Sequence, residues 1–183
     1  MNFKNIIKHI KLVLHHKWIV FKLCCKIGEP WRGFMHDFSK FSPTEFIESI
    51  KYYNGTHSPI LEAKKDLGYS KAWLHHKGRN KHHYEYWIDN AAPNPTPIMP
   101  YKYAVEMICD KLAAGMTYEG KKWTKEYELE YWKKEMNVEK SKMNIAMKEF
   151  ITEVLTQVAN NGIDNTLTKK NIKQIYKKYC DQK

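Results

Sequence analysis

The amino-acid sequence predicts an all-α protein, and three observations support this prediction. Apolar residues recur at helical spacing in several long segments. Glycines and prolines separate these segments, and helix-capping residues stand at several of the boundaries. No segment alternates apolar and polar residues as a half-buried strand does. A chain of 183 residues, 43% of them hydrophobic, fits one domain with its own core, so we expect a single helical bundle over residues 1–183.

The first helix is predicted from the beginning of the chain to about Gly28, where a Gly-Glu-Pro break follows. Its strongest signal is an apolar stripe at helical spacing, formed by Phe3, Ile7, Ile10, Leu14, Trp18 and Phe21. A second apolar line carries His16 and consists of Val13, Val20, Leu23 and Ile27. His15 instead shares its face with lysines. We therefore expect His16 to point into the protein and His15 to point outward.

Capping residues predict the next three helices. Ser42, Pro43 and Glu45 provide an N-cap, a proline at the first helical position and a capping-box acid. A glycine ends the second of these helices, and a serine precedes the third. The expected bounds are Pro43 to about Tyr53, Ser58 to Gly68, and Ser70 to residues 77–81.

The second half of the chain is also predicted to be helical after one irregular segment. Asn80 is expected to cap a helical segment that runs through Tyr86 and Trp87. Four prolines then predict an extended loop, namely Pro93, Pro95, Pro97 and Pro100. Further helices are expected at residues 101–115, 122–136, 138–160 and 168–179. Residues 124–183 contain no histidine, so we expect these last helices to support the bundle or to form a dimer contact.

The chain has more basic than acidic residues, and this imbalance indicates which classes of molecule it is suited to bind. The 31 Lys and Arg outnumber the 20 Asp and Glu, which gives a net charge of +11. This charge favours anionic partners such as phosphate esters, nucleic acid or acidic lipid, although a lysine-rich surface also serves solubility alone. No stretch approaches the ~20 apolar residues of a membrane span, and none resembles a signal peptide. The four cysteines form no CxxC pair and indicate reduced thiols, so we expect a cytoplasmic protein without a membrane partner.

Histidines are concentrated in a few places along the chain. Seven of the nine fall into three clusters, which are His15-His16, His36, and the group His75, His76, His82 and His83. Neutral imidazole is the commonest metal ligand in proteins, and carboxylates complete sites for Zn, Mn or Fe. The clustering therefore indicates a metal site.

Two carboxylates are candidates to complete this site. Asp37 follows His36 within an apolar run that we expect to bury both residues, formed by Trp31, Phe34, Met35, Phe38 and Phe41. Asp110 lies in a largely apolar helical stretch, with Glu106 one turn earlier on the same face. Burying acids and imidazoles among apolar residues is unfavourable unless they are paired or bound to a metal.

The order of His16, His36-Asp37 and Asp110 resembles the HD superfamily of metal-dependent phosphohydrolases. The segments His16-x-x-x-Val20 and Met35-His36-Asp37-Phe38-Ser39-Lys40 carry the resemblance, which covers about residues 10–115. It implies an HD-like helical bundle in which these four residues bind a divalent metal, with supporting C-terminal helices over about residues 122–180. The longer pattern is similar to a family of uncharacterised bacterial and phage proteins, whose function is not established. That pattern adds Asn80-x-His82-His83, Glu85-Tyr86-Trp87 and Glu106-Met107-x-Cys109-Asp110.

A second metal ion is also consistent with the resemblance. HD proteins that bind two metals have two further histidines between the His-Asp pair and the last Asp. This chain offers His76 and either His82 or His83 in that interval. The resemblance thus implies one or two ions of Fe, Mn or Zn. The same histidines also fit surface imidazoles, caps for the turn around Gly78, or contacts to substrate.

The resemblance implies hydrolysis of a phosphate ester, with a nucleotide as one candidate for the anionic small-molecule substrate. Asp37 would anchor the metal, Lys40 and Arg79 would neutralise the transition state, and Glu106 or a free histidine would transfer a proton. Two alternatives remain open. One is a dinuclear iron oxygenase of the HD type, which metal analysis would separate from a hydrolase. The other is a basic helical module that binds nucleic acid around a structural metal, which predicts a four-coordinate site closed to water.

Overall fold

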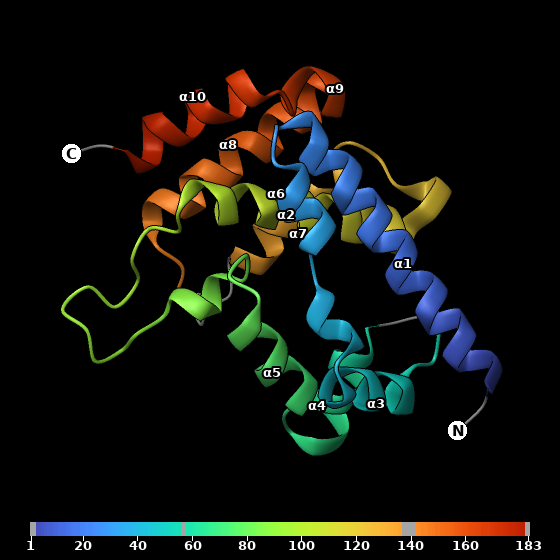
Figure 1. Cartoon of the computed structure of the whole chain (residues 1–183). Coiled ribbons are helices and arrows are strands. Elements are labelled where there is room, and N and C mark those ends of the chain that lie inside the picture. Colours follow the sequence, from blue (N-terminus) through green and yellow to red (C-terminus); the bar gives the residue numbers. More distant parts are fainter. Residues whose placement is uncertain (1–2, 56–57, 137–141, 182–183) are drawn as a thin grey trace.

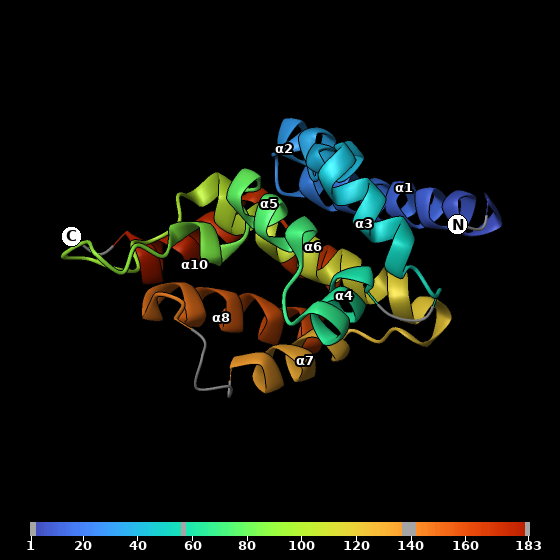
Figure 2. The same ribbon diagram turned by 90° about the horizontal axis from the view of Figure 1, so that it is seen from below.

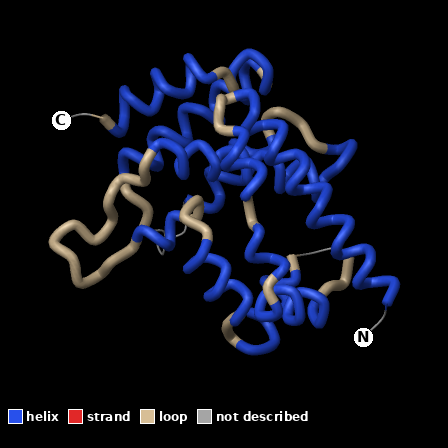
Figure 3. The backbone as a smooth tube through the Cα atoms, viewed as in Figure 1, coloured by secondary structure: helices blue, strands red, loops and turns tan. Residues whose placement is uncertain are grey.

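The computed structural model describes residues 3–55, 58–136 and 142–181. These residues form ten α-helices and three short 3-10 helices, and no strand occurs among them (Figure 3). The predicted all-α class is therefore confirmed. The α-helices are α1 (Phe3–Lys26), α2 (Pro30–Met35), α3 (Pro43–Tyr52), α4 (Pro59–Leu67), α5 (Lys71–Arg79), α6 (Tyr101–Glu119), α7 (Tyr127–Met136), α8 (Ile145–Asn161), α9 (Ile163–Thr166) and α10 (Lys169–Cys180). The 3-10 helices are η1 (Phe38–Phe41), η2 (Tyr84–Trp87) and η3 (Gly120–Lys122).

Helix α6 lies at the centre of the arrangement. Figure 2 shows α1 on one side of α6, with α7 and α8 on the other. Helix α10 packs on α8, while α3, α4 and α5 form a separate group that reaches α1 through α3 (Figure 1). The hydrophobic core runs through these layers, with fully buried members such as Val20, Leu112, Trp132, Phe150 and Ile172.

Two apolar lines run along α1, and the line that gives the stronger sequence signal is the exposed one. Phe3, Leu14 and Trp18 are 50–72% exposed, whereas the line with His16 faces α6 and is buried. The large apolar side chains around His36 are also exposed. They therefore do not bury His36 and Asp37 as the sequence had led us to expect. Those side chains are Trp31, Phe34, Met35, Phe38 and Phe41. Periodicity identifies a helix, but only packing decides which of two apolar faces the rest of the chain covers.

Several predicted boundaries are confirmed because local caps set them. Ser42 and Ser70 each accept a hydrogen bond from the third residue that follows, and Gly68 ends α4 with a positive φ of 75°. The expected loop is also present, because residues 88–100 contain no helix and project from the body of the protein (Figure 1).

Other boundaries differ from the prediction. Helix α6 continues to Glu119, and α7 begins at Tyr127, five residues later than expected. Helix α8 begins at Ile145, where the Asn144 side chain caps it, and residues 138–141 of the expected segment lie outside the described residues. The short α9 was not predicted. Asn80 ends α5 and does not cap the next helix, which is only a 3-10 turn.

No helix in the described part of the chain is long and apolar enough to cross a membrane.

Candidate metal centre

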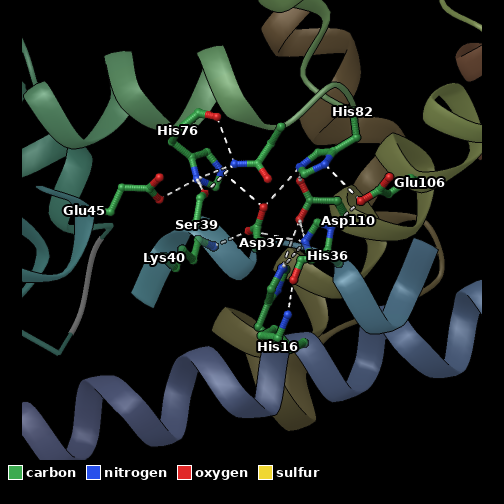
Figure 4. A network of polar contacts seen from close by, with 12 residues as sticks. His16, His36, Asp37, Ser39, Lys40, Glu45, His76, His82, Glu106 and Asp110 are labelled. Carbon is green, nitrogen blue, oxygen red and sulfur yellow. Dashed lines mark hydrogen bonds and ion pairs between the residues drawn. The ribbon is translucent and has the colours of Figure 1, made fainter. Parts of the chain in front are cut away.

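Four separate segments bring the predicted ligands together between α1, α5 and α6. His16 comes from α1, His36 and Asp37 from the junction of α2 and η1, and Asp110 from α6 (Figure 4). His76 comes from α5, and His82 and His83 from the turn that follows it. His16, His36, Asp37, His76 and His82 are all at most 7% exposed. His15 is exposed, so the predicted orientations of His16 and His15 are confirmed.

A close approach of α2 to α1 places His36 beside His16. A Cβ atom at Gly33 would lie 2.7 Å from the Cβ of Cys24 and 2.8 Å from the Cα of Phe21, so only glycine permits this packing. The chain then turns sharply at Asp37, the only non-glycine residue with positive φ (53°) in the described chain. In this left-handed conformation the Asp37 carboxylate lies beside the His36 ring, with Oδ2 3.3 Å from His36 Nε2. Such backbone strain persists where the surrounding structure requires it, often at functional sites.

One group of four candidate ligand atoms comes from His16, His36, Asp37 and Asp110, and these atoms all lie within 4.8 Å of one another. His16 Nε2 lies 3.0 Å from Asp110 Oδ1 and 3.4 Å from His36 Nε2. His36 Nε2 lies 3.3 Å from Asp37 Oδ2 and 3.4 Å from Asp110 Oδ1. Ligands that bind one ion tetrahedrally at about 2.0–2.1 Å lie about 3.3–3.4 Å from one another. The spacing of this group fits one transition-metal ion.

A second group uses the other oxygen of Asp37. Asp37 Oδ1 lies 3.3 Å from His76 Nε2 and 3.4 Å from His82 Nε2. A nitrogen of His83 completes this group, whose ligand atoms all lie within 4.8 Å of one another. Asp110 also approaches it, with Oδ2 3.6 Å from His82 Nε2. Asp37 therefore offers one oxygen to each group, as a carboxylate that bridges two metal ions does.

The polar atoms of this cluster lack the partners that a metal-free core would need. Asp37 Oδ1, His82 Nε2 and His83 Nε2 are buried, and none makes a hydrogen bond within the described chain. Leaving such an atom unsatisfied costs about 1–3 kcal/mol. Since all three atoms belong to residues of the second group, the donor set fits a metal ion better than a structural hydrogen-bond network.

Glu106 orients two of the histidines from behind. Its Oε1 lies 3.1 Å from His36 Nδ1 and 3.2 Å from His82 Nδ1, while the Nε2 atoms of both rings face the candidate metal positions. Arg32 donates to the other Glu106 oxygen, with its Nε at 2.8 Å. Carboxylates that bind the far nitrogen of a ligating histidine fix its ring orientation. Glu106 is thus placed to position the His36 ring through a hydrogen bond and lies close to His82, and it does not line the cavity at the candidate ligands.

Glu45 has the same relation to His76. Its carboxylate lies 2.7 Å from the Nδ1 atoms of both His75 and His76. The predicted capping box is therefore only half formed: Ser42 caps the Glu45 backbone N–H, but the Glu45 side chain is used elsewhere. Sequence analysis missed Glu45 and Arg32 as site residues, because each joins the site through a partner at least 30 residues away.

The carboxylates of the cluster are held in their ionised form. Burial opposes ionisation of Asp37, but the positive charges of His36 and Lys40 hold its pKa well below its usual value. Burial also opposes ionisation of Asp110. Hydrogen bonds from His16 and His36 nevertheless lower the pKa of Asp110 well below its usual value. Contacts with His36 likewise overcome burial and lower the pKa of Glu106 to about 2. Ionised carboxylate is the form that binds a metal ion.

Comparison with known protein families gives one match, which covers residues 5–157. The chain belongs to DUF5662, a family of unknown function. The DUF5662 match includes every proposed metal ligand and ends within α8. Searches of curated proteins and of solved structures found no match. Since no comparison names an HD protein, the HD resemblance stays a prediction.

Lys40 and Arg79, the two cations predicted at the site, differ in their distance from the candidate ligands. Lys40 Nζ lies 2.7 Å from Asp37 Oδ2 and lines a cavity of about 170 Å³ that also borders His16, His76 and Asp110. Burial opposes its charge, but Asp37 and Asp110 raise the pKa of Lys40 above its ordinary value. Arg79 is exposed at the end of α5 and does not line this cavity, so the structure does not bring it to the ligands.

A further histidine reaches the cavity. His9, which belongs to none of the three histidine clusters in the sequence, is buried about two turns before His16 on α1 and lines the same cavity. Burial and the nearby charge of Lys40 lower the pKa of His9 to about 4, so its imidazole is neutral at pH 7. The line of His9, Val13 and His16 along α1 is the signal that could have found it. His57 lies outside the described residues.

Substituting His16 or His15 tests the assignment of the ligands on α1. His16→Ala should lower the metal content by about one equivalent, because it removes one of four donors from the first group. His15→Ala is the matched control and should keep the full metal content, because His15 is exposed. Elemental analysis of both purified variants measures the difference. Equal metal loss from both variants would contradict the assignment.

Proposed function

We propose that this protein is a metal-dependent phosphohydrolase of the HD kind with two metal ions. The observation that carries the proposal is the shared position of Asp37, whose two oxygens belong to two different groups of ligand atoms. His16, His36, Asp37 and Asp110 would hold the first ion, and Asp37, His76, His82 and His83 the second. Divalent ions bound there would polarise a phosphoryl oxygen and make water a stronger acid, which is the usual role of paired metals in hydrolysis.

Residues of the chain itself prepare the cavity for an anion. The Lys40 ammonium lines the cavity, stays charged, and can donate to a phosphoryl oxygen as well as to Asp37. His9 lines it as a neutral imidazole and can accept a hydrogen bond from a substrate hydroxyl. Glu106 and Glu45 hold the rings of His36, His82 and His76 in the orientations required for binding. These features support an anionic phosphate ester as the substrate.

The cavity argues against a purely structural metal. A structural site is closed by its four protein ligands, whereas catalysis requires a position that water or substrate can reach. The cavity borders Asp37, His76 and Asp110, so the ligands of both groups have an accessible side. This favours an enzyme over a nucleic-acid-binding module. The HD-type iron oxygenase would use the same ligands and requires iron, so it would be favoured if only iron-loaded protein were active and consumed dioxygen.

Hydrolysis of simple phosphate esters tests the proposed function. Protein loaded with Mn²⁺, Zn²⁺ or Fe²⁺ should hydrolyse 4-nitrophenyl phosphate or bis(4-nitrophenyl) phosphate, and metal-depleted protein should not. Lys40→Met should lower kcat by about 100-fold, as removal of one charge-stabilising donor commonly does. Arg79→Gln removes an exposed cation and should change the rate by less than about 2-fold. Failure of every metal-loaded form to cleave either ester would contradict the proposal.

A further inference from the structure

A second hollow of about 380 Å³ adjoins the cavity at the metal ligands. The two share wall residues, including Trp73, His83, Asp110 and Tyr118. From there the hollow continues along α6 to α7, where Glu128 and Tyr131 form its far side. A molecule with one end at Asp110 can therefore extend into this hollow. Its volume lies within the range of small-molecule sites, about 300–1,000 Å³.

Aromatic rings form much of its wall. Trp73, Tyr118, Tyr127 and Tyr131 all line the hollow. The rings of Tyr127 and Tyr131 are nearly parallel, with centroids 6.4 Å apart and an interplanar angle of 13°. Tyr118 and Tyr131 are 49% and 53% exposed, so their faces are available to a ligand. Such walls suit a planar ring, which can stack on an aromatic face.

Glu128 provides a carboxyl group within this aromatic hollow. It is only 4% exposed, and its Oε1 has no hydrogen-bond partner in the described chain. Gly115 on the facing helix α6 makes room for it, because a Cβ at that position would overlap the carboxyl oxygen. The nearby Lys111 is engaged elsewhere, with its Nζ 2.6 Å from Glu135. A buried carboxyl oxygen without a hydrogen-bond partner is unfavourable for folding, and a donor on a ligand would satisfy it.

The protonation state of Glu128 decides which hydrogen-bonding groups it can offer to a ligand. Burial raises the pKa of Glu128 to about 7, and the charge of Lys111 opposes this shift only in part. Near neutral pH the group is therefore available both as a carboxylic acid and as a carboxylate. The acid pairs one O–H donor with one acceptor, and the carboxylate offers two acceptors. Either form can bind two adjacent polar atoms at the edge of a heterocycle.

We propose that Glu128 is a specificity-determining residue that binds the base of a nucleoside phosphate. The base would lie in the aromatic hollow with its polar edge on Glu128, while the phosphate of the same molecule would lie at the metal ligands. This inference rests on the proposed function for the position of the phosphate. The aromatic walls, the unpartnered carboxyl oxygen and the continuity of the two cavities support the position of the base independently.

Equilibrium dialysis with nucleosides, nucleotides and phosphate tests this inference. The probes are the four common ribonucleosides, their 5′-monophosphates and inorganic phosphate, each with metal-loaded protein. We expect at least one nucleoside and its monophosphate to bind. Glu128→Gln, which keeps the size of the side chain, should weaken both by about 10-fold or more, because a hydrogen bond in a buried site is lost or mismatched. Glu130→Gln, an exposed change on the same helix, should leave both affinities within about 2-fold.

Each outcome separates this inference from the proposed function. If phosphate binds but no nucleoside or nucleotide binds more tightly than phosphate, the phosphohydrolase proposal survives and this inference is wrong. If nucleosides bind equally to wild type and Glu128→Gln, the role of Glu128 is wrong. If a nucleoside binds through Glu128 while the protein binds neither metal nor phosphate, the base site stands and the proposed function fails.

Discussion

Replacing Asp37 with Ala is expected to remove both metal ions and to abolish hydrolysis. Asp37 contributes Oδ2 to one group of ligands and Oδ1 to the other, so no other substitution of a single carboxylate or histidine weakens both groups as strongly. Metal ions contribute several kcal/mol to stabilising the charge of a transition state. The rate should therefore fall by about 1,000-fold or more. Elemental analysis and an assay with a phosphate ester measure the two effects.

The Asp37 variant needs a test of folding and a matched control. Removing this buried carboxylate leaves the positive charges of His36 and Lys40 without their partner, so stability should also fall by about 3–5 kcal/mol. Circular dichroism will show whether the helices persist. Asp164→Ala removes an exposed carboxylate from a surface ion pair and should leave metal content and rate unchanged. An Asp37→Ala protein that folds and keeps one full metal equivalent would show that Asp37 does not serve both groups.

Replacing His76 and His82 together with Ala is expected to remove one metal ion and leave the other. The first group keeps its four ligands, namely His16, His36, Asp37 and Asp110, whereas the second loses two histidines. Activity toward a phosphodiester should nevertheless fall by about 100-fold or more, because one ion alone cannot stabilise both the attacking and the leaving oxygen. Metal stoichiometry and kcat, measured on the same preparation, separate the two effects.

A double substitution of two other histidines is the matched control for this variant. His15 is exposed, and His75 contacts Glu45 but belongs to neither group of ligands. The His15→Ala and His75→Ala protein should keep two equivalents of metal and most of its activity. If the His76 and His82 variant also keeps two equivalents and full turnover, these histidines are bystanders and a single-metal hydrolase becomes the better account.

The amino-acid sequence determined the helical class, most of the helices and the candidate residues of the site. Helix ends at Ser42, Gly68 and Ser70 follow from hydrogen bonds or backbone conformations within a few residues, so local sequence is sufficient to predict them. The orientation of His16 follows from its place on an apolar line with the period of a helix. Both signals depend on neighbouring residues and on the fixed geometry of one helix.

Only the tertiary structure decided how the candidate ligands fall into two groups and which other side chains contact them. The division of the Asp37 oxygens between two groups depends on four segments that meet in space. The contacts of Arg32 and Glu106 span 74 residues, and no local pattern encodes them. The same holds for Glu128, which becomes a candidate only because Gly115 and the aromatic hollow lie opposite it. The exposure of the Phe3, Leu14 and Trp18 stripe of α1 is also a tertiary property, since periodicity measures spacing along one helix and not how much of each apolar line the rest of the chain covers.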